Sequence, residues 1–291
     1  MGGCPWAAEV RLRDVEGELK ALASSARLRR RARVRSAIAS LRRTIDLLRA
    51  LTEADLLFRY GRGSGRFLRW LLEPFAVVGV YLLFVTFLLN RPGDAPGLSL
   101  ACAVVPFQFV ILTVANALEA ITVRRPILLN MRFERKLIPI SSTLTETSAF
   151  SASLVLIPVM MVVYHVAPTA AIGWVPLVLL VNVYLAAASA YAASLLGLWL
   201  AELKPFLMSF VRMLFFLGPG LVSLSQASAR SREILRFNPL SGMMEAYRSI
   251  FLEGHAPAPW ELLYPLGIAS VLLLVFVPLY SSEQRQFAKV L

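Results

Sequence analysis

One arginine is notable because it lies inside an apolar stretch. Arg212 is seven residues beyond Pro205, where that stretch begins. An ionisable side chain inside a membrane is unfavourable unless it faces water or a partner. A guanidinium pairs well with phosphate oxygens, so Arg212 could bind a phosphate group in transit. Two alternatives stay open, in which Arg212 reaches the cytoplasmic interface or pairs with Glu146.

Four aromatic residues form a second candidate site. Tyr81 and Phe84 fall on one face of a predicted helix, and Phe206 and Phe210 are one turn apart on another. Aromatic faces can stack on sugar rings, so these side chains and Arg212 are candidates for a substrate conduit. The alternative is that the aromatic side chains pack in the interior or face lipid.

A basic segment at 122–136 separates two apolar stretches. It carries five bases and one acid, with apolar residues between the bases. A short helix lying across the ends of the spans would explain this pattern and would offer a docking surface. The alternative is a loop whose positive charge only sets the membrane topology. The candidate docking residues are Arg124, Arg125, Met131, Arg132, Phe133, Glu134 and Arg135.

The segment 236–254 has the residues expected at helix boundaries. Asn238 suits an N-cap, Pro239 suits the first helical position, and Gly254 suits the stop. The pattern predicts an interfacial or re-entrant helix at the outer mouth of the protein, and a plain surface helix is the alternative. The candidate residues of this outer segment are Asn238, Pro239, Met243, Tyr247 and Arg248.

Residues suited to covalent chemistry are few. The histidines are His165 and His255, the cysteines are Cys4 and Cys102, and no CxxC motif is present. Catalysis at a membrane face needs paired carboxylates, histidine or a metal, and the candidates here are scattered. We therefore expect no catalytic residue, metal or cofactor in this chain, and we expect Cys102 to pack as a small hydrophobic residue.

The composition identifies the class of protein that must position these residues. Hydrophobic residues make up 57% of the 291 positions and charged residues only 16%, against about 25% in soluble domains. Residues 74–90, 95–118, 147–201 and 262–282 carry no charge at all. Uncharged runs of about 18 residues or more indicate membrane-spanning helices. The sequence therefore predicts an all-α integral membrane protein and excludes soluble enzymes, disordered proteins and disulfide scaffolds.

Six spans account for these runs. The stretch 147–201 is too long for one helix, because about 20 residues cross the hydrocarbon, and a turn at 165–173 divides it. Basic residues mark the cytoplasmic side, which gives an N-in, C-in topology. A bend is expected at Gly218-Pro219-Gly220 in the fifth span. The predicted spans are 70–89, 98–118, 144–164, 174–200, 205–224 and 262–280.

The region before the first span is strongly basic. Residues 1–69 hold sixteen bases and seven acids, an excess of nine positive charges. The Arg-rich arm 1–36 is expected to bind anionic lipid rather than nucleic acid, because it leads into a membrane span. Apolar residues at helical spacing in 37–66 predict an amphipathic helix on the membrane surface or packed on the protein. Residues 67–291 form the transmembrane domain.

Several short motifs occur in an order typical of one family. They are Arg59-Tyr60-Gly61-Arg62, residues 70–74 (WLLEP), the segment 116–131, Phe237-Asn238-Pro239-Leu240 with Tyr247-Arg248, and the ending 286–291. From about residue 45 to its end, the chain resembles the membrane subunit of ABC-2 type exporters of the capsule, O-antigen and teichoic acid class. The sequence departs from the family at Gly65-Arg66, and Trp70 is displaced by one residue.

This resemblance implies a homodimer bound to two copies of an ABC ATPase subunit in the cytoplasmic (inner) membrane. It implies that 122–136 is the coupling helix and that 236–254 forms outer gate helices. The substrate would be a polysaccharide or another lipid-linked or phosphate-bearing glycan. ATP and Mg²⁺ would bind to the partner, because this chain has no Walker A motif. The alternatives are export of a lipid or a drug and, as a different class, a membrane-embedded glycosyl or acyl transferase.

Overall fold

The structure, a computed structural model, describes residues 38–57, 65–88, 95–125 and 135–283. These residues form helices and connecting turns, with no strand among them, which confirms the predicted all-α fold. The chain divides into two compact units, Met1–Ala50 and Leu51–Leu291. Residues 38–57, within the predicted amphipathic segment 37–66, are helical, and the predicted arm 1–36 lies outside the described residues.

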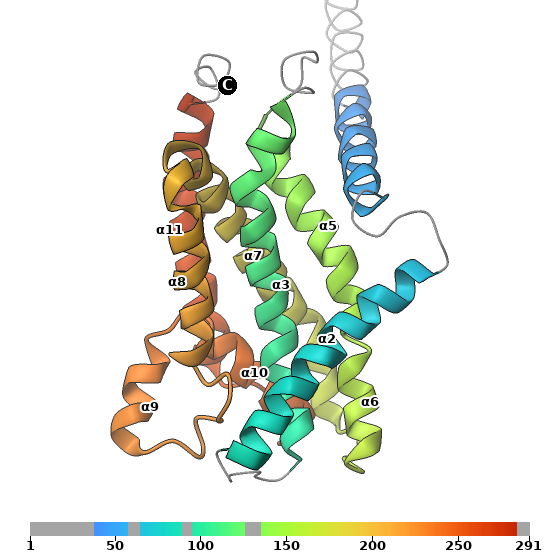
Figure 1. Cartoon of the computed structure of the whole chain (residues 1–291), viewed down its shortest axis with the longest axis vertical. Helices are drawn as coiled ribbons and strands as arrows, with labels where there is room; N and C mark the ends of the chain where they lie inside the picture. The colour runs from blue at the N-terminus through green and yellow to red at the C-terminus, as the bar shows by residue number, and fades with distance from the viewer. Residues whose placement is uncertain (1–37, 58–64, 89–94, 126–134, 284–291) are drawn as a thin grey trace, which may run out of the picture. The chain divides into compact units, whose positions relative to one another are not determined.

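Helix α3 (Pro96–Val123) is the centre of the larger unit. Pro96 occupies the first turn, where no backbone donor is needed, and Ala95 before it has a left-handed φ of 49°. The helix is apolar on all sides, and residues from Leu98 to Ile121 are largely buried. It packs against five helices, several of which Figure 1 shows: α2 (Gly65–Leu83), α5 (Leu137–Ser153), α7 (Val175–Trp199), α8 (Lys204–Phe216) and α10 (Ser241–Phe251). Cys102 is fully buried in α3, as predicted.

The third predicted span begins seven residues before its predicted start. It consists of α5 (Leu137–Ser153) and α6 (Leu156–Val163), separated by a turn at Leu154-Val155. Serine and threonine hydroxyls along α5 donate hydrogen bonds to carbonyls three or four residues earlier. These local bonds satisfy the hydroxyls, so a helix rich in Ser and Thr can be buried.

The fourth and sixth predicted spans match α7 (Val175–Trp199) and α11 (Pro259–Glu283) closely. Between α6 and α7, the chain turns at His165, whose φ is 55°, and passes through the 3₁₀ helix η2 (Ala170–Trp174). Helices α3 and α7 approach very closely: a Cβ atom added to Gly197 would lie 2.1 Å from the carbonyl oxygen of Leu118. Glycine therefore permits this crossing.

Four of the helical segments in the described ranges are long and apolar enough to cross a membrane: Pro96–Val123, Leu137–Val163, Ala170–Trp199 and Pro259–Glu283. The first predicted span is helical in α2 (Gly65–Leu83) and the π-helical turn η1 (Phe84–Leu88), but its apolar part covers only Phe75–Phe87. The fifth is the 13-residue α8 (Lys204–Phe216), preceded by η3 (Ala201–Leu203). Thirteen residues extend about 20 Å, less than the hydrocarbon thickness of about 30 Å. The count of six spans therefore stays a prediction.

The expected bend at Gly218-Pro219-Gly220 is instead the end of a helix. Helix α8 ends at Phe216, eight residues before the predicted end of the span. A Cβ atom at Gly218 would lie 2.7 Å from the Asn238 amide nitrogen, and the carbonyls of Pro219 and Gly220 accept hydrogen bonds from Arg248. The helix thus ends before this segment, whose carbonyls bond a side chain of α10.

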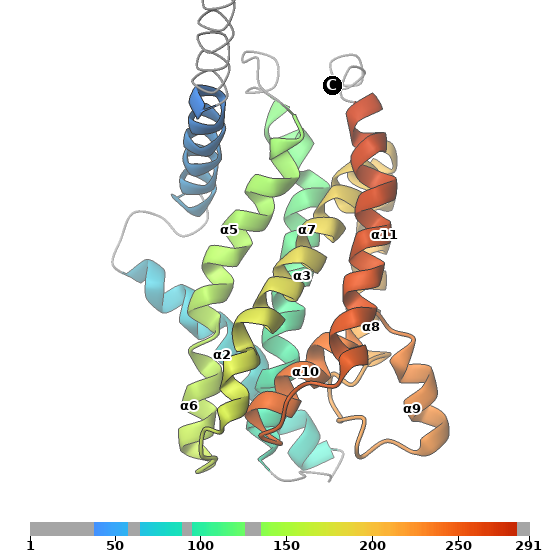
Figure 2. The same cartoon turned by 180° about the vertical axis from the view of Figure 1, so that it is seen from behind.

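The prediction of a single helix that begins after an N-cap at Asn238 is also wrong. The chain forms α9 (Ala229–Arg236) and, after a turn, α10 (Ser241–Phe251). Residues 241–250 of α10 are all buried, which excludes the plain surface helix. In Figures 1 and 2, α10 lies across the ends of the long helices, at the end of α3 that contains Pro96.

Candidate functional site

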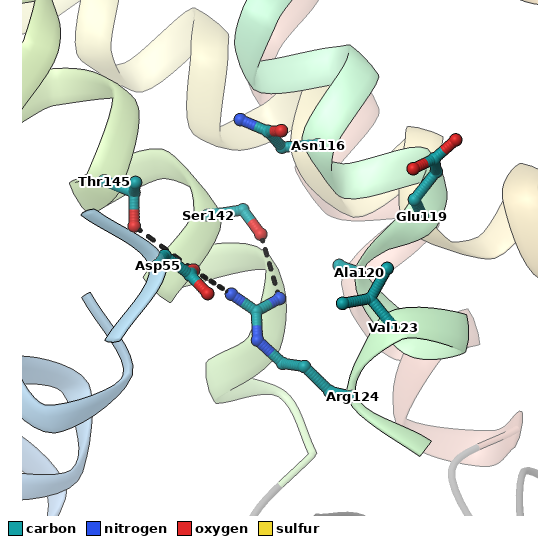
Figure 3. A pocket seen from close by; sticks show the side chains of 8 residues that line it. All are labelled: Asp55, Asn116, Glu119, Ala120, Val123, Arg124, Ser142 and Thr145. Atoms are coloured by element: carbon teal, nitrogen blue, oxygen red, sulfur yellow. Dashed lines mark hydrogen bonds and ion pairs between the residues drawn. The ribbon is translucent and has the colours of Figure 1, made fainter. Parts of the chain in front are cut away.

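The end of α3 at Arg124 is fixed by a buried ion pair. The Arg124 side chain is only 7% exposed, and its Nη2 donates to Asp55 Oδ2. Its Nη1 donates to Ser142 Oγ at 3.4 Å, and Asp55 accepts a further hydrogen bond from Thr145 Oγ1 at 3.3 Å. Figure 3 shows these side chains meeting from three segments, the helix that contains Asp55, the end of α3, and α5. We call this group the Arg124 cluster.

A cavity of about 260 Å³ lies beside the Arg124 cluster. Asn116 and Glu119 of α3 line it together with the members of the cluster. Glu146, on α5, is buried and accepts a hydrogen bond from the Asn116 side chain. Arg212 is exposed on α8, so it and Glu146 lie in different environments.

The end of the basic segment 122–136 is held by two tyrosines. The hydroxyl of Tyr280 on α11 donates to the carbonyl of Arg135 at 3.2 Å, and that of Tyr191 on α7 donates to the carbonyl of Lys136 at 3.0 Å. The two rings meet edge to face with centroids 5.7 Å apart. The described residues on both sides of 126–134 are therefore held by other helices.

The predicted docking residues differ in exposure, and some of them lie outside the described residues. Arg125 is exposed, whereas the Arg124 guanidinium points inward to Asp55. Arg135 is partly buried. Met131, Arg132, Phe133 and Glu134 lie outside the described residues, so a docking role for this segment stays a prediction.

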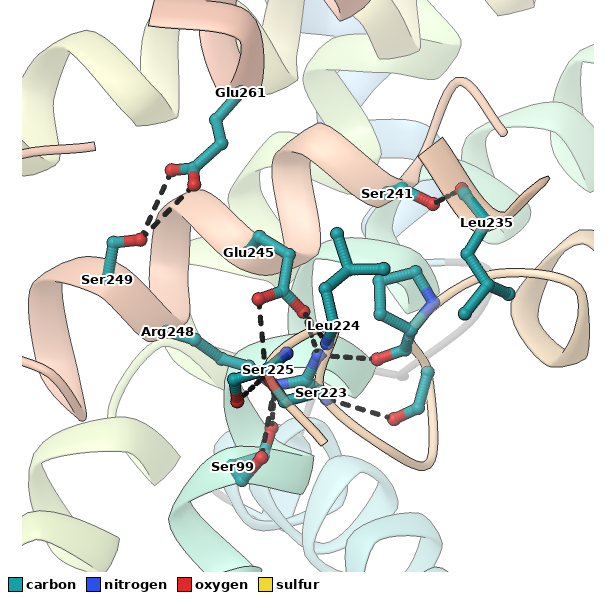
Figure 4. Close-up of polar contacts among 12 residues, drawn as sticks. Ser99, Ser223, Leu224, Ser225, Leu235, Ser241, Glu245, Arg248, Ser249 and Glu261 are labelled. Atoms are coloured by element: carbon teal, nitrogen blue, oxygen red, sulfur yellow. Dashed lines mark hydrogen bonds and ion pairs between the residues drawn. The ribbon is translucent and has the colours of Figure 1, made fainter. Parts of the chain in front are cut away.

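The opposite end of the larger unit is organised around Arg248, which is fully buried on α10. Its Nη1 donates to Glu245 Oε1 at 2.6 Å and to the carbonyl of Pro219, and its Nη2 donates to the carbonyl of Gly220. Its Nε donates to Ser99 Oγ at 3.0 Å on the first turn of α3. Figure 4 shows this arrangement, which we call the Arg248 cluster.

Glu245 extends the Arg248 cluster to the loop before α9. Its carboxylate accepts hydrogen bonds from Ser223 Oγ at 3.3 Å and from the backbone N–H of Leu224 at 3.2 Å. A cavity of about 250 Å³ lies beside these residues, and Ser99, Ser223, Gln226 and Glu253 contribute to its lining. One buried ion pair thus joins α10, α3 and the loop at 219–224.

The other predicted residues of the outer segment have structural contacts. Asn238 accepts a hydrogen bond from the N–H of Leu240 and donates one to the carbonyl of Leu214, so it stabilises the turn before α10 and the end of α8. Pro239 lies in the same turn. Met243 and Tyr247 are buried, and the Tyr247 hydroxyl accepts a hydrogen bond from Asn182. Gly254 has a φ of 74° and lies three residues beyond the end of α10, so the helix stops before the predicted residue.

The predicted conduit residues do not share one environment. Tyr81 is partly buried and stacks on Phe215 of α8 with ring centroids 5.1 Å apart. Phe84, which is 40% exposed, lies in the π-helical turn rather than in the α-helix expected for it. Phe206 and Phe210 are 69% and 48% exposed on α8. The exposed rings are available for substrate, lipid or a second copy, so the conduit remains a prediction.

Sequence reasoning missed the partners that the two arginines bond. Glu245 precedes Arg248 by three residues, a spacing at which helical side chains meet, so this pair was open to prediction. Asp55 is 69 residues from Arg124, and no local pattern connects the two. Tyr191 and Tyr280 bond backbone carbonyls, which a pattern of side chains does not reveal. Within the described ranges, no three His, Cys, Asp or Glu residues gather as metal ligands.

The loop between α10 and α11 contains a histidine with a raised pKa. His255 Nδ1 lies 2.9 Å from the carbonyl of Ala256, and Nε2 lies 2.7 Å from Glu253 Oε2. Both contacts favour the doubly protonated ring, the backbone contact most strongly, so the pKa of His255 is raised from its ordinary value of 6.5. This stabilising contribution is fully present below about pH 6.5 and disappears as the pH rises through the raised pKa.

A histidine NMR titration of the purified protein tests this assignment. We expect His255 to titrate above about pH 6.5 in a His165→Asn background, in which only one histidine remains. Glu253→Gln is expected to lower that pKa only in part, because the Ala256 carbonyl remains. A midpoint at or below 6.5 in the His165→Asn protein would contradict the two contacts.

Known proteins similar to this chain include permease proteins of O-antigen export systems. No family model matches the sequence. The O-antigen export system permease protein RfbA of Myxococcus xanthus is 27% identical over 246 residues, which cover 84% of this chain and 94% of that protein. The protein of the same name from Klebsiella pneumoniae is 23% identical over 248 residues, 84% of this chain and 95% of its own length. Over most of its length the chain is therefore similar to permeases of O-antigen export systems, which confirms the resemblance predicted from its motifs.

Proposed function

We propose that this chain is the membrane-spanning permease subunit of an ATP-driven ABC-2 exporter that moves a polysaccharide across the cytoplasmic membrane. The observation that carries this proposal is the similarity to O-antigen export permeases along 84% of the chain. Four apolar helices among the described residues support a multi-pass membrane protein. The permease itself has no covalent chemistry in this mechanism, because it carries substrate rather than transforming it.

The proposed topology has six spans with both termini in the cytoplasm. The Arg124 cluster and the segment 122–136 then lie on the cytoplasmic side, and the Arg248 cluster lies on the outer side. The basic residues of 122–136 support this orientation, since cytoplasmic loops are enriched in Lys and Arg. The arm 1–36 would contact anionic lipid of the inner leaflet and no nucleic acid.

The proposed assembly is a homodimer bound to two copies of an ABC ATPase subunit, which binds ATP and Mg²⁺. The ATPase subunit would receive the segment 122–136 as a coupling helix. The outer segment 236–254 would form the gate helices, and the exposed aromatic residues on α8 and in η1 would line the conduit between two copies. A phosphate-bearing or lipid-linked glycan suits such a conduit, because aromatic faces stack on sugars and Arg212 can bind phosphate.

The alternatives receive less support. Export of a lipid or a drug needs the same architecture, but the relatives are named for O-antigen export. A membrane-embedded transferase needs a cluster of catalytic groups. The carboxylates of Asp55 and Glu245 are instead engaged by arginine, hydroxyl and backbone partners.

Co-purification from the native host tests the proposal directly. A tagged copy should recover an ATPase subunit and restore surface polysaccharide in a strain that lacks the gene. The double variant Arg132→Glu, Arg135→Glu should lose both while reaching the membrane at the wild-type level, because charge reversal removes the basic docking surface.

Arg230→Glu is the matched control, because Arg230 is an exposed base on α9 at the other end. It should retain the ATPase subunit and export. Normal export by the double variant would contradict the coupling role of 122–136. Wild-type protein that restores no surface polysaccharide and recovers no ATPase subunit would contradict the proposed function itself.

A further inference from the structure

The Arg124 side chain has an internal partner rather than an external one. Its position at the start of the basic segment suggests a contact with the ATPase subunit, yet its guanidinium is 7% exposed and directed at Asp55 and Ser142 (Figure 3). A guanidinium held in this way is not available to a docking protein. Its charge therefore acts inside the permease, unlike that of the exposed Arg125.

The Arg124 cluster joins three segments that are distant in sequence. Asp55 lies near the end of the helical residues 38–57, Arg124 directly follows α3, and Thr145 and Ser142 lie on α5. The Asp55 carboxylate is the common acceptor, since it takes hydrogen bonds from both Arg124 and Thr145. Charge-assisted hydrogen bonds are stronger and more directional than apolar contacts. Removing Asp55 would therefore release Arg124 from the helix that precedes the first span.

The second flank of the basic segment is tied differently. The hydroxyls of Tyr280 and Tyr191 bond the carbonyls of Arg135 and Lys136, so hydrogen bonds join this flank to α11 and α7. If the chain after Arg124 moves, Asp55 would therefore pass that movement to residues 51–57. Tyr191 and Tyr280 would pass it to α7 and α11.

We propose that Asp55 is a positioning residue of the exporter: by holding Arg124 against α5, it transmits movement at the ATPase-facing end of α3 to the helix that precedes the first span. This inference rests on the proposed function, because it needs an ATPase that moves this end. The cavity of about 260 Å³ beside the pair provides space for the side chains to shift without unpacking apolar residues. Asp55 is 32% exposed, so its carboxylate is accessible to water during such a shift.

The test compares Asp55→Asn with wild type in the purified complex of permease and ATPase subunit, reconstituted in lipid vesicles. Asparagine keeps the shape of the side chain but removes the charge. We expect ATP hydrolysis and the recovery of ATPase subunit to be unchanged, and polysaccharide export per ATP hydrolysed to fall about tenfold, the loss expected for one charge-assisted hydrogen bond.

Exchanging the charges of Asp55 and Arg124 shows whether Asp55 acts through its pairing with Arg124 or only through its own charge. Asp55→Arg and Arg124→Asp should each lower export per ATP at least as much as Asp55→Asn does. The double variant with both changes should recover to within about threefold of wild type, because the opposite charges face each other again. Glu119→Gln is the control, since Glu119 lines the same cavity but is not bonded to Arg124 in the described contacts.

The possible outcomes distinguish the positioning role of Asp55 from the proposed function of the whole protein. Wild-type export per ATP in Asp55→Asn would overturn the positioning role while leaving the proposed function intact. A parallel loss of the ATPase subunit or of thermal stability in Asp55→Asn would also overturn it, because the residue would then serve assembly or folding. A double variant no better than the two single variants would overturn the pairing. Wild-type permease that recovers no ATPase would overturn the proposed function first.

Discussion

Replacing Arg248 with methionine is expected to lower the free energy of unfolding by about 3 to 5 kcal/mol. Arg248 is fully buried, and Glu245 beside it is nearly so. Methionine fills much of the space but leaves the Glu245 carboxylate without its opposite charge. It also removes the donor that the carbonyls of Pro219 and Gly220 and the hydroxyl of Ser99 share.

The measurement is the temperature at which the detergent-purified protein loses its monodisperse elution profile. Arg230→Met is the matched control, because Arg230 is an exposed arginine on α9, and its melting temperature should stay at the wild-type value. The double variant Glu245→Gln, Arg248→Met should melt above Arg248→Met, since it removes the unpaired charge. A wild-type melting temperature in Arg248→Met would show that the buried pair does not stabilise this end.

Replacing Gly197 with alanine is expected to cost about 3 kcal/mol, the upper part of the usual range for overpacking. A Cβ atom there would lie 2.1 Å from the carbonyl oxygen of Leu118 and 2.8 Å from its Cα. These are backbone atoms of α3, so no side-chain rotation relieves the clash. Helices α3 and α7 would have to move apart over a contact that both bury extensively.

The same melting assay tests this expectation, with Gly267→Ala as control. Gly267 is a helical glycine on α11, and an added Cβ atom there would meet nothing within 4 Å. The control should retain or raise the wild-type melting temperature, because alanine favours helix more than glycine does. Equal melting temperatures for the two variants would mean that α3 and α7 do not depend on this close approach.

Much of the helical framework was predictable because it depends on one property of the sequence, the absence of charge from long apolar runs. A charge-free apolar run identifies a span whatever it packs against, and three such runs, 95–118, 147–201 and 262–282, account for the four long apolar helices. The start of the third span was not predictable in this way. Its first turns are rich in Ser and Thr, which count as polar, although their hydroxyls bond to the backbone of α5.

The end of α8 and the contacts of the two arginines depend on tertiary structure. The Gly218-Pro219-Gly220 segment can bend a helix or end it, and the choice follows from Arg248, which bonds two of its carbonyls from a different helix. Arg124 belonged to the predicted basic segment, but its direction is set by Asp55, 69 residues earlier. A single sequence shows which residues carry charge and does not show which of them meet.

The burial of Cys102 has a practical consequence for measuring motion in this protein. Its thiol lies inside α3 with no exposed surface, so water-soluble maleimide and nitroxide reagents do not reach it in the folded protein. Once Cys4 is replaced, a cysteine introduced at any exposed position becomes the one accessible attachment site. Pairs of spin labels on α9 and at Arg125 would then report distances between the two ends of the molecule during ATP turnover, with α3 left in its native sequence.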